Sequence, residues 1–307
     1  MQPTKVMILG FIYASLSTII GGVTVVLTRL IITETDPLSL AFIRYGIGGI
    51  AVAIILYIVS SPPRIQSGDR IAIILLGMVM FAAFPYLMAK SLEDTTAARG
   101  GLLFATMPLV TIVIGAMFKV EKLNLTKILA VLCAMIGTSI AISENIDSTA
   151  PKALVGDFFM FLGMIAVSIF NVFSRPYLLK YGNLALMTYT LFFGVMTLFL
   201  LAVIFGAPFN GSLSFDIRGW SIVLVLAIPG GTLMFLLWGR ALRSISPTQA
   251  AIATGLNPVT AILLGAWILY EPVTFRLIGG FLLILLGILI SSRSKITPEP
   301  HVILAKD

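Results

Sequence analysis

Apolar runs of about 20 residues recur along nearly the whole chain, separated by short polar segments that contain glycine and proline. A run of roughly 20 apolar residues is long enough to cross the hydrocarbon core of a bilayer as a helix. The pattern therefore predicts ten transmembrane helices. Their expected ranges are 6–31, 37–59, 70–91, 97–118, 124–143, 154–178, 184–205, 219–242, 248–269 and 274–292.

The composition agrees with this pattern and leaves no room for a soluble domain. Of the 307 residues, 59% are hydrophobic and only 11% are charged, whereas soluble domains are about half apolar and about a quarter charged. The first apolar run lacks the small-residue cleavage pattern of a signal peptide, so we expect it to remain as a transmembrane helix. The expected fold class is an all-α, multi-pass membrane protein.

Loop charge indicates how these helices are oriented. An even number of helices places both termini on one side, and the loops of that side carry nearly twice as many Lys and Arg residues as the opposite loops. Because basic residues favour the cytoplasmic side, we expect both termini, with the polar tail 294–307, in the cytoplasm. The net charge of +7 follows from this sorting. The basic residues form no continuous patch, which excludes nucleic-acid binding.

Two apolar stretches 150 residues apart share an unusual proline. In FATMPLVTIVIGAMFKVE and TGLNPVTAILLGAWILYE, Pro108 and Pro258 fall inside expected helices, and each is followed by Gly-Ala and then by a glutamate, Glu121 or Glu271. A proline in a helix interior removes a hydrogen bond and costs about 3 kcal/mol. We therefore expect both prolines to bend helices that face a central cavity and to let their half-helices hinge.

The earlier helices of the two halves also align, with an offset of 146 residues, for example Gly48 with Gly194. The chain is thus predicted to consist of two five-helix repeats, residues 1–147 and 148–293. Because five is odd, the second repeat enters the membrane from the opposite face. Inverted repeats are an architecture of transporters, with the substrate near the midplane and alternating access between the repeats.

Three segments resemble the drug/metabolite transporter superfamily, specifically its EamA-type bacterial exporters. These are DPLSLAFIRY, which contains Arg44, and the proline segments ATMPLVTIVIG and GLNPVTAILLG. Within the superfamily the chain is most similar to the aromatic amino acid exporters of the bacterial inner membrane. The resemblance implies export of amino acids, including aromatic ones, with broad specificity through a central cavity. Thr190 aligns with Arg44, so this arginine is not duplicated.

Polar, aromatic and small residues near the expected midplane are the candidates for transport. The substrate-binding candidates are Arg44, Tyr45, Phe84, Ser168, Asn171, Met234, Thr254 and Asn257, and the hinge or gating candidates are Gly21, Gly22, Pro85, Pro108, Gly230, Gly231 and Pro258. Each has an alternative interpretation. Hydroxyls can bond their own helix backbone, small residues allow close helix packing, and aromatic side chains can fill packing or face lipid.

Arg44 is the most informative of these candidates because a charge inside the membrane is costly and indicates function by default. Its functional interpretation is attraction of a substrate carboxylate. The alternatives are extension of the side chain to the interface or a structural ion pair with Asp36, Glu93 or Asp94. Asn171 and Asn257 are amides that need partners in hydrocarbon, and facing the cavity is one of two interpretations that remain open for each.

Other chemistry is poorly represented in the sequence. Every Asp and Glu falls near a helix end, in a loop or in the tail, so no midplane carboxylate indicates proton coupling, and facilitated efflux and a coupled mechanism both stay open. With one cysteine, Cys133, and one histidine, His301, we expect no metal site, no cofactor and no enzymatic activity. The partners expected are a small-molecule substrate and lipid. Efflux of other metabolites or drugs is the alternative function, and a membrane-embedded enzyme is a weaker one.

Overall fold

The computed structural model describes residues 3–59, 63–120, 124–143, 150–244 and 253–292, and throughout these ranges the regular structure is helical. Within them, seven helices are long and apolar enough to cross a membrane, and three further apolar helices are shorter. Residues 1–2, 60–62, 121–123, 144–149, 245–252 and 293–307 lie outside the described ranges, and with them Glu121, the boundary expected at 147 and the tail 294–307.

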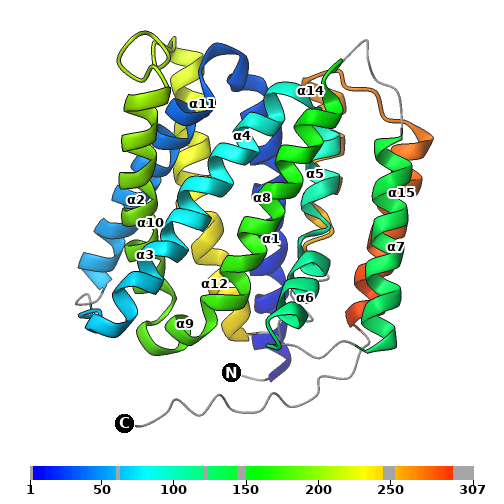
Figure 1. Cartoon of the computed structure of the whole chain (residues 1–307), viewed down its shortest axis with the longest axis horizontal. Helices are drawn as coiled ribbons and strands as arrows, with labels where there is room; N and C mark the ends of the chain where they lie inside the picture. The colour runs from blue at the N-terminus through cyan, green and yellow to red at the C-terminus, as the bar shows by residue number, and fades with distance from the viewer. Residues whose placement is uncertain (1–2, 60–62, 121–123, 144–149, 245–252, 293–307) are drawn as a thin grey trace.

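The N-terminal half of the chain contains α1 Pro3–Ile31, η1 Ile32–Glu34, α2 Pro37–Val59, η2 Ser67–Asp69, α3 Arg70–Met78, η3 Val79–Ala83, α4 Phe84–Asp94, α5 Ala97–Phe104, α6 Met107–Met117 and α7 Leu125–Ile142. The C-terminal half contains α8 Ala153–Phe173, α9 Arg175–Tyr181, α10 Asn183–Phe205, α11 Ile217–Ala227, η4 Ile228–Leu233, α12 Met234–Ser244, α14 Leu256–Ile268 and α15 Phe275–Ser292. The long helices run side by side between two ends of a bundle (Figure 1). We call the end where α1 begins and α15 ends the lower end, and the opposite end the upper end.

Two of the expected helices, 70–91 and 219–242, each contain a π-helical turn that the sequence pattern did not predict. These turns are η3, between α3 and α4, and η4, between α11 and α12. Pro85 follows η3 by two residues and Pro229 lies inside η4. A proline cannot donate to the carbonyl four residues earlier and clashes with it, and a π-turn accommodates this defect without ending the helix.

The expected helices at 97–118 and 248–269 are interrupted before their prolines. A turn at Ala105 and Thr106 separates α5 from α6, and a turn at Thr254 and Gly255 precedes α14. Pro108 and Pro258 then occupy the first turn of the following helix, where the missing N–H leaves no hydrogen bond unmade. The expectation of continuous bent helices is therefore corrected to broken ones.

One expected helix, 154–178, ends earlier than the hydrophobic pattern suggests. The structure ends α8 at Phe173, places Ser174 between helices and begins the short α9 at Arg175. Pro176 explains the break, because it disfavours helical geometry in the residue before it. The shift moves the C-terminal residues of α8 from the expected midplane to the lower end of the bundle (Figure 1).

Most large helix contacts join one half of the chain to the other. In the centre, α3 and α4 pack on α10 and α8, while α11 and α12 pack on α2 and α1. Further contacts pair α2 with α10, α1 and α5 with α14, and α6 with α8. The third helix of each half thus finds its main neighbours in the opposite half.

The last helices of the halves, α7 and α15, form a pair at one side of the bundle (Figure 1). They approach closely at glycines: a Cβ on Gly137 would lie 2.6 Å from the Gly280 carbonyl oxygen, and one on Gly287 would lie 2.6 Å from the Ala130 carbonyl oxygen. Such backbone proximity is how membrane helices associate through van der Waals packing. Gly280 and Gly287 of α15 are therefore used in packing within the chain.

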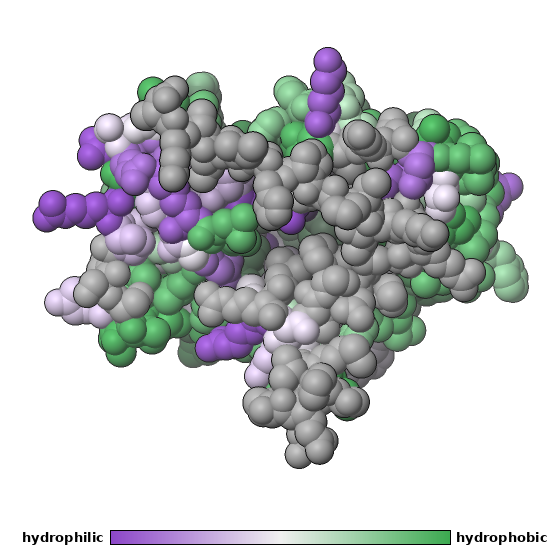
Figure 2. Space-filling model, turned by 90° about the horizontal axis from the view of Figure 1, so that it is seen from below, coloured by the Kyte–Doolittle hydropathy of each residue, from purple (hydrophilic) through white to green (hydrophobic). Residues whose placement is uncertain are grey.

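Seen from below, hydrophilic residues are most concentrated on the left of the molecule, and hydrophobic residues dominate on the right (Figure 2). The hydrophilic side lies under α3 and α9, where Lys180 pairs with Asp69 at 2.6 Å and Tyr181 donates a hydrogen bond to the same carboxylate. These groups are partly exposed to solvent. They form a contact between the two halves at the lower end.

Candidate functional site

Arg44 is buried between the two halves. Its side chain extends from α2, is only 4% exposed and stacks on the ring of Tyr45, with 5.0 Å from the guanidinium carbon to the ring centroid. Nε donates to the Leu226 carbonyl at 3.3 Å and Nη1 donates to the Thr28 hydroxyl at 3.3 Å. A guanidinium has five N–H donors, so several stay available for a ligand.

No carboxylate of the described chain pairs with this arginine. Asp36 instead accepts hydrogen bonds from the backbone N–H groups of Ser39 and Ala207, and Glu93 pairs with Lys90 at 2.5 Å. The structural ion pairs considered from the sequence are therefore absent among the described residues. A buried charge without a counterion is unfavourable, which favours an anionic ligand.

The α1 face beside Arg44 carries hydroxyls and glycines in a line. Ser17, Gly21, Thr24 and Thr28 recur at helical spacing and are all buried. The Ser17 hydroxyl donates to the Met234 carbonyl at 2.9 Å, and the Thr24 hydroxyl donates to the Gly21 carbonyl at 2.7 Å. This polar line follows α1 from the middle of the bundle toward its upper end.

Close backbone approaches hold the neighbouring helices against this line. A Cβ on Gly21 would lie 2.5 Å from Asn257 Nδ2, and one on Gly22 would collide with the Asn257 carbonyl oxygen. A Cβ on Gly230 would likewise collide with the Thr24 methyl group and lie 3.7 Å from Arg44 Nη2. Gly231 lies beside the α2 backbone, where the Thr232 hydroxyl donates to the Gly48 carbonyl at 3.0 Å.

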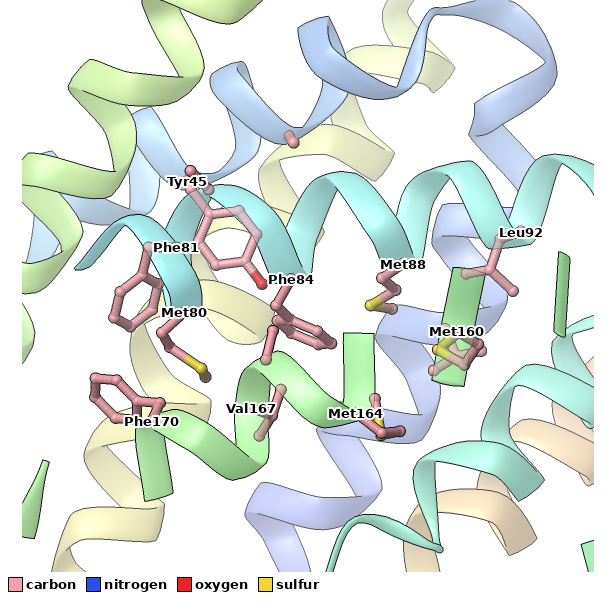
Figure 3. Packing of buried hydrophobic residues seen from close by; sticks show 14 of the residues in the cluster. Tyr45, Met80, Phe81, Phe84, Met88, Leu92, Met160, Met164, Val167 and Phe170 are labelled. Atoms are coloured by element: carbon pink, nitrogen blue, oxygen red, sulfur yellow. The ribbon is translucent and has the colours of Figure 1, made fainter. Parts of the chain in front are cut away.

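An apolar wall lies on the other side of Arg44. Tyr45 packs on Phe81 with ring centroids 6.0 Å apart, and Phe81 contacts Phe170 and Phe235 edge-on at 6.1 and 5.5 Å. Figure 3 shows these buried side chains from α2, η3 and α8 gathered near Met80 and Phe84, with Met88, Met160 and Met164 further along the α4–α8 contact. Methionine and aromatic side chains adapt to apolar ligands of varied shape.

The structure brings several sequence-predicted candidates into this region. Arg44, Tyr45, Phe84 and the half-buried Met234 surround the α1 line and the apolar wall, and Asn257 lies against Gly21. Thr254 is 7% exposed, in the turn that precedes α14.

Two candidates lie elsewhere. Ser168 is fully buried in the α6–α8 contact, where it receives a hydrogen bond from Thr111 at 3.1 Å. Asn171 is exposed in the last turn of α8 at the lower end. Its predicted midplane position is therefore corrected, because α8 ends at Phe173 rather than at 178.

The hinge candidates divide into two groups. Gly21, Gly22, Gly230 and Gly231 are points of close helix contact, as described above, whereas Pro85, Pro108 and Pro258 follow irregular helix turns. The turn before Pro108 is stabilised by the Thr106 hydroxyl, which donates to the Leu103 carbonyl at 2.6 Å. The breaks are thus local and hydrogen-bonded, and their capacity to hinge stays a prediction.

The upper end contains a buried ion pair that the sequence did not predict. Arg99 in α5 binds Asp157 in α8, with 3.0 Å from Nε to Oδ2, and both side chains are about 5% exposed. The Thr95 hydroxyl donates to the same carboxylate at 2.8 Å. A Cβ on Gly156 would lie 2.6 Å from the Ser91 carbonyl oxygen. We call Arg99, Asp157, Thr95 and this backbone contact the upper latch.

Glu271 extends the connection between the halves at the upper end. Its carboxylate accepts hydrogen bonds from the backbone N–H groups of Ala97 (2.8 Å) and Ala98 (3.1 Å) at the start of α5, where the helix dipole favours negative charge. Burial raises the pKa of Glu271 above its usual value near 4.5, and the two N–H groups and Arg29 oppose that rise. Gly265 leaves room for the carboxylate, since a Cβ there would lie 2.9 Å from Oε2.

Further residues of the site relate to different sequence signals. Thr24 lies near the expected midplane of the first helix, and Thr28 shares the helical period of Ser17, Gly21 and Thr24, which predicts one common face. Asp157 lies one turn inside α8, and Arg99 lies in the first turn of α5. From the sequence of each helix alone, both residues look like ordinary charged residues near a helix end. Their pairing depends on long-range packing, for which the sequence of either helix carries no signal.

A bundle of apolar helices that buries an arginine between its halves, without a carboxylate partner among the described residues, is typical of a multi-pass membrane protein with a functional charge inside the membrane. Comparison with known proteins specifies the class. The EamA-like transporter family matches residues 8–143 and again residues 154–293. The chain therefore belongs to the EamA-like transporter family and is a multi-pass membrane transporter.

Individual relatives agree with this assignment. The chain is 24% identical over 275 residues to the "Uncharacterized transporter YoaV" of Bacillus subtilis, covering 90% of this chain and 94% of the relative. It is 23% identical over 266 residues to an "Uncharacterized transporter" of Archaeoglobus fulgidus, covering 85% and 90%. A solved structure described as "Crystal structure of protein" shares the fold, with a TM-score of 0.66 and 18% identity over 94% of this chain and 96% of that one.

Proposed function

We propose that the protein exports amino acids, including aromatic ones and with broad specificity, across the bacterial inner membrane. The observation that carries this proposal is the arginine at position 44, which is buried, has no carboxylate partner among the described residues and adjoins an apolar wall. An arginine binds a carboxylate through charge-assisted, often bidentate hydrogen bonds. The adjacent rings and methionines suit an apolar side chain on the same ligand.

The proposed mechanism is alternating access between two inverted five-helix repeats with cytoplasmic termini. Its support is the double family match, the occurrence of a π-turn in the third helix of each half and the location of Arg44 where the halves meet. In inverted-repeat transporters the binding site lies at the repeat interface near the midplane, and one repeat rocks against the other.

The contacts at the two ends support a state that is closed toward the upper end. The upper latch and the Glu271 contact are buried and join the halves directly. The Lys180–Asp69 contact at the lower end is partly exposed. Outward release of substrate then requires the upper latch to separate while contacts form elsewhere.

Transport by purified protein in liposomes tests the proposed function. The panel consists of aromatic and aliphatic amino acids, nucleotides and organic cations, each measured with and without a pH gradient. We expect transport of aromatic amino acids. Transport of organic cations alone would instead identify a drug exporter, and absence of transport for every amino acid would refute the proposal.

A further inference from the structure

A second buried polar group whose hydrogen-bonding capacity is not fully used borders the same helix as Arg44. Asn257, in the first turn of α14, is 3% exposed, and its side-chain oxygen Oδ1 is buried without a hydrogen-bond partner. A buried acceptor without a partner is uncommon in native proteins and needs an explanation. Asn257 Oδ1 needs a hydrogen-bond donor, whereas the remaining N–H groups of Arg44 need an acceptor.

Both groups border the same face of α1. Asn257 Nδ2 lies against Gly21, whereas Arg44 lies against Thr28 and, through Gly230, against Thr24. Gly21 and Thr28 are seven residues apart on one helix, which corresponds to about 10 Å along its axis, and Gly21 and Thr24 to about 4.5 Å. The free acceptor and the free donors are thus about one to two helical turns apart.

This separation suits a ligand that carries a donor and an anion on neighbouring atoms. An ammonium nitrogen and a carboxylate oxygen attached to one carbon are about 3 Å apart. With a hydrogen bond of about 3 Å at each end, the two protein groups that hold them can be up to roughly 9 Å apart. The Gly21–Thr24 separation of about 4.5 Å lies within that range, and the Gly21–Thr28 separation of about 10 Å lies close to its upper limit.

Resting on the proposed function, we propose that Asn257 and Arg44 together recognise the zwitterionic head of the substrate. Arg44 binds the carboxylate, and Asn257 Oδ1 accepts a hydrogen bond from the α-ammonium group. The site therefore selects molecules with a free amino group beside a carboxylate, whatever the apolar side chain. Carboxylates without the amino group, and N-acylated amino acids, are poor substrates.

Because the Asn257 acceptor is a neutral amide, the preference for substrates with a free amino group has a limited size. A hydrogen bond between a neutral and a charged group contributes about 1.5–3 kcal/mol, which corresponds to about a 10- to 150-fold preference. We expect the wild-type protein to prefer L-phenylalanine over 3-phenylpropionate and over N-acetylphenylalanine by that factor. The three probes share the aromatic ring and the carboxylate, so the comparison isolates the amino group.

The decisive experiment measures the substrate preference of variants at position 257. Asn257→Leu keeps the approximate shape and removes the acceptor, so the ratio of phenylalanine to 3-phenylpropionate transport should fall to about 1. Asn257→Asp keeps the acceptor and should retain the preference. Asn171→Leu is the matched control, because it removes an exposed amide at the lower end and should leave the ratio unchanged.

Ligand-induced thermal stabilisation of the purified variants provides a second measurement where transport of a poor substrate is too slow. The inference is overturned if wild-type protein handles N-acetylphenylalanine as well as phenylalanine. It is also overturned if Asn257→Leu, eluting as a folded monodisperse protein, weakens both carboxylates equally. Failure of the proposed function looks different, because then wild-type protein neither carries nor is stabilised by any amino acid.

Discussion

The two halves of the molecule build equivalent positions with opposite chemistry. Where the N-terminal half has Arg44 and Thr24 against Gly230 in η4, the C-terminal half has Thr190 and Phe170 at the aligned positions, beside Phe81 in η3. The Thr190 hydroxyl is satisfied by its own helix, donating to the Leu186 carbonyl at 2.7 Å. One side of the interface is thus polar and incompletely bonded, while the other is aromatic and fully packed.

This difference indicates how a symmetric scaffold can hold an asymmetric ligand. A pair of identical sites would present two arginines or two aromatic walls, neither of which suits an amphiphile. With Arg44 and Thr24 on one side of the interface and the Phe81 and Phe170 rings on the other, the head and the side chain of the proposed amino acid substrate would meet different surfaces. The proposed function would then reside in the residues that differ between aligned positions of the two halves.

The upper latch joins the two halves at the upper end, and its loss should have the largest effect. Asp157→Asn removes one member of a buried ion pair, which destabilises the closed upper end by about 3–5 kcal/mol. We expect faster thiol labelling of a Ser91→Cys reporter in a Cys133→Ser background, since Ser91 is fully buried at this contact. The control variant Asp69→Asn, in the partly exposed pair at the lower end, should leave the labelling rate unchanged. If Asp157→Asn also leaves the labelling rate unchanged, the latch has no gating role.

Arg44→Gln should produce the next largest effect. The loss of charge-assisted hydrogen bonds worth about 1.5–3 kcal/mol corresponds to roughly a 10- to 150-fold reduction in transport of carboxylate substrates. The measurement is initial transport rate in liposomes. Thr190→Ala at the aligned position should change it little, and an equal loss for a substrate without a carboxylate would identify Arg44 as a structural residue.

Glycines at close helix contacts should be more sensitive to substitution than a glycine with space beside it. A Cβ on Gly194 would collide with Phe81, and one on Gly48 would lie 2.9 Å from the Ala227 carbonyl oxygen, so both alanine substitutions should lower the melting temperature, through overpacking of about 1–3 kcal/mol. Gly49→Ala is the matched control, because its nearest neighbour would be 3.8 Å away. Equal stability of all three variants would show that the interface relaxes freely.

The aromatic wall should set selectivity among side chains. Phe170→Leu removes the ring contact with Phe81, and aromatic pairs contribute about 0.5–1.5 kcal/mol, so preference for phenylalanine over leucine should fall by roughly 2- to 10-fold. Competition between the two amino acids in liposomes measures this ratio. Phe192→Leu, at an exposed ring pair, should not alter it, and an effect of similar size there would locate the selectivity elsewhere.

The smallest expected effect concerns pH. Because burial raises the pKa of Glu271 above its usual 4.5, the folded protein binds a proton more tightly than the unfolded chain does. Its contribution to stability is therefore present below pH 4.5 and is lost as pH rises through the raised pKa. The melting temperature of the wild type relative to Glu271→Gln should fall over that window, and a flat difference would contradict this linkage.

Sequence and structure agree best where hydrophobic periodicity decides the outcome. The ranges of α2 and α10 match the expected helices closely, because uninterrupted apolar runs of this length have few alternatives. The π-turns were not predicted, since Pro85 and Pro229 indicate a defect without specifying whether the chain bends, breaks or bulges. Pro108 and Pro258 illustrate the same limit, because their helices break rather than bend.

The candidate site was predictable in part. Arg44 and Asn257 were identified because polar groups in apolar helices are rare, whatever their partners. Asn171 was expected near the midplane because α8 was expected to continue to residue 178, whereas α8 ends at Phe173. Asp157 was not a candidate, because it is buried by contact with α5 from the other half of the chain. Long-range pairing of this kind becomes visible only when both helices are placed in space.

The packing of the third helix of each half on the opposite half has a consequence for how the protein is made. While the ribosome is still synthesising α8 onward, α3 and α4 have entered the membrane without the neighbours that later bury Gly77 and Phe81. Until α10 is inserted, these surfaces contact lipid or the insertion machinery instead of their final helix neighbours. Assembly is thus completed late, and a truncated chain would be left with its inner surfaces exposed to the bilayer and to cellular quality control.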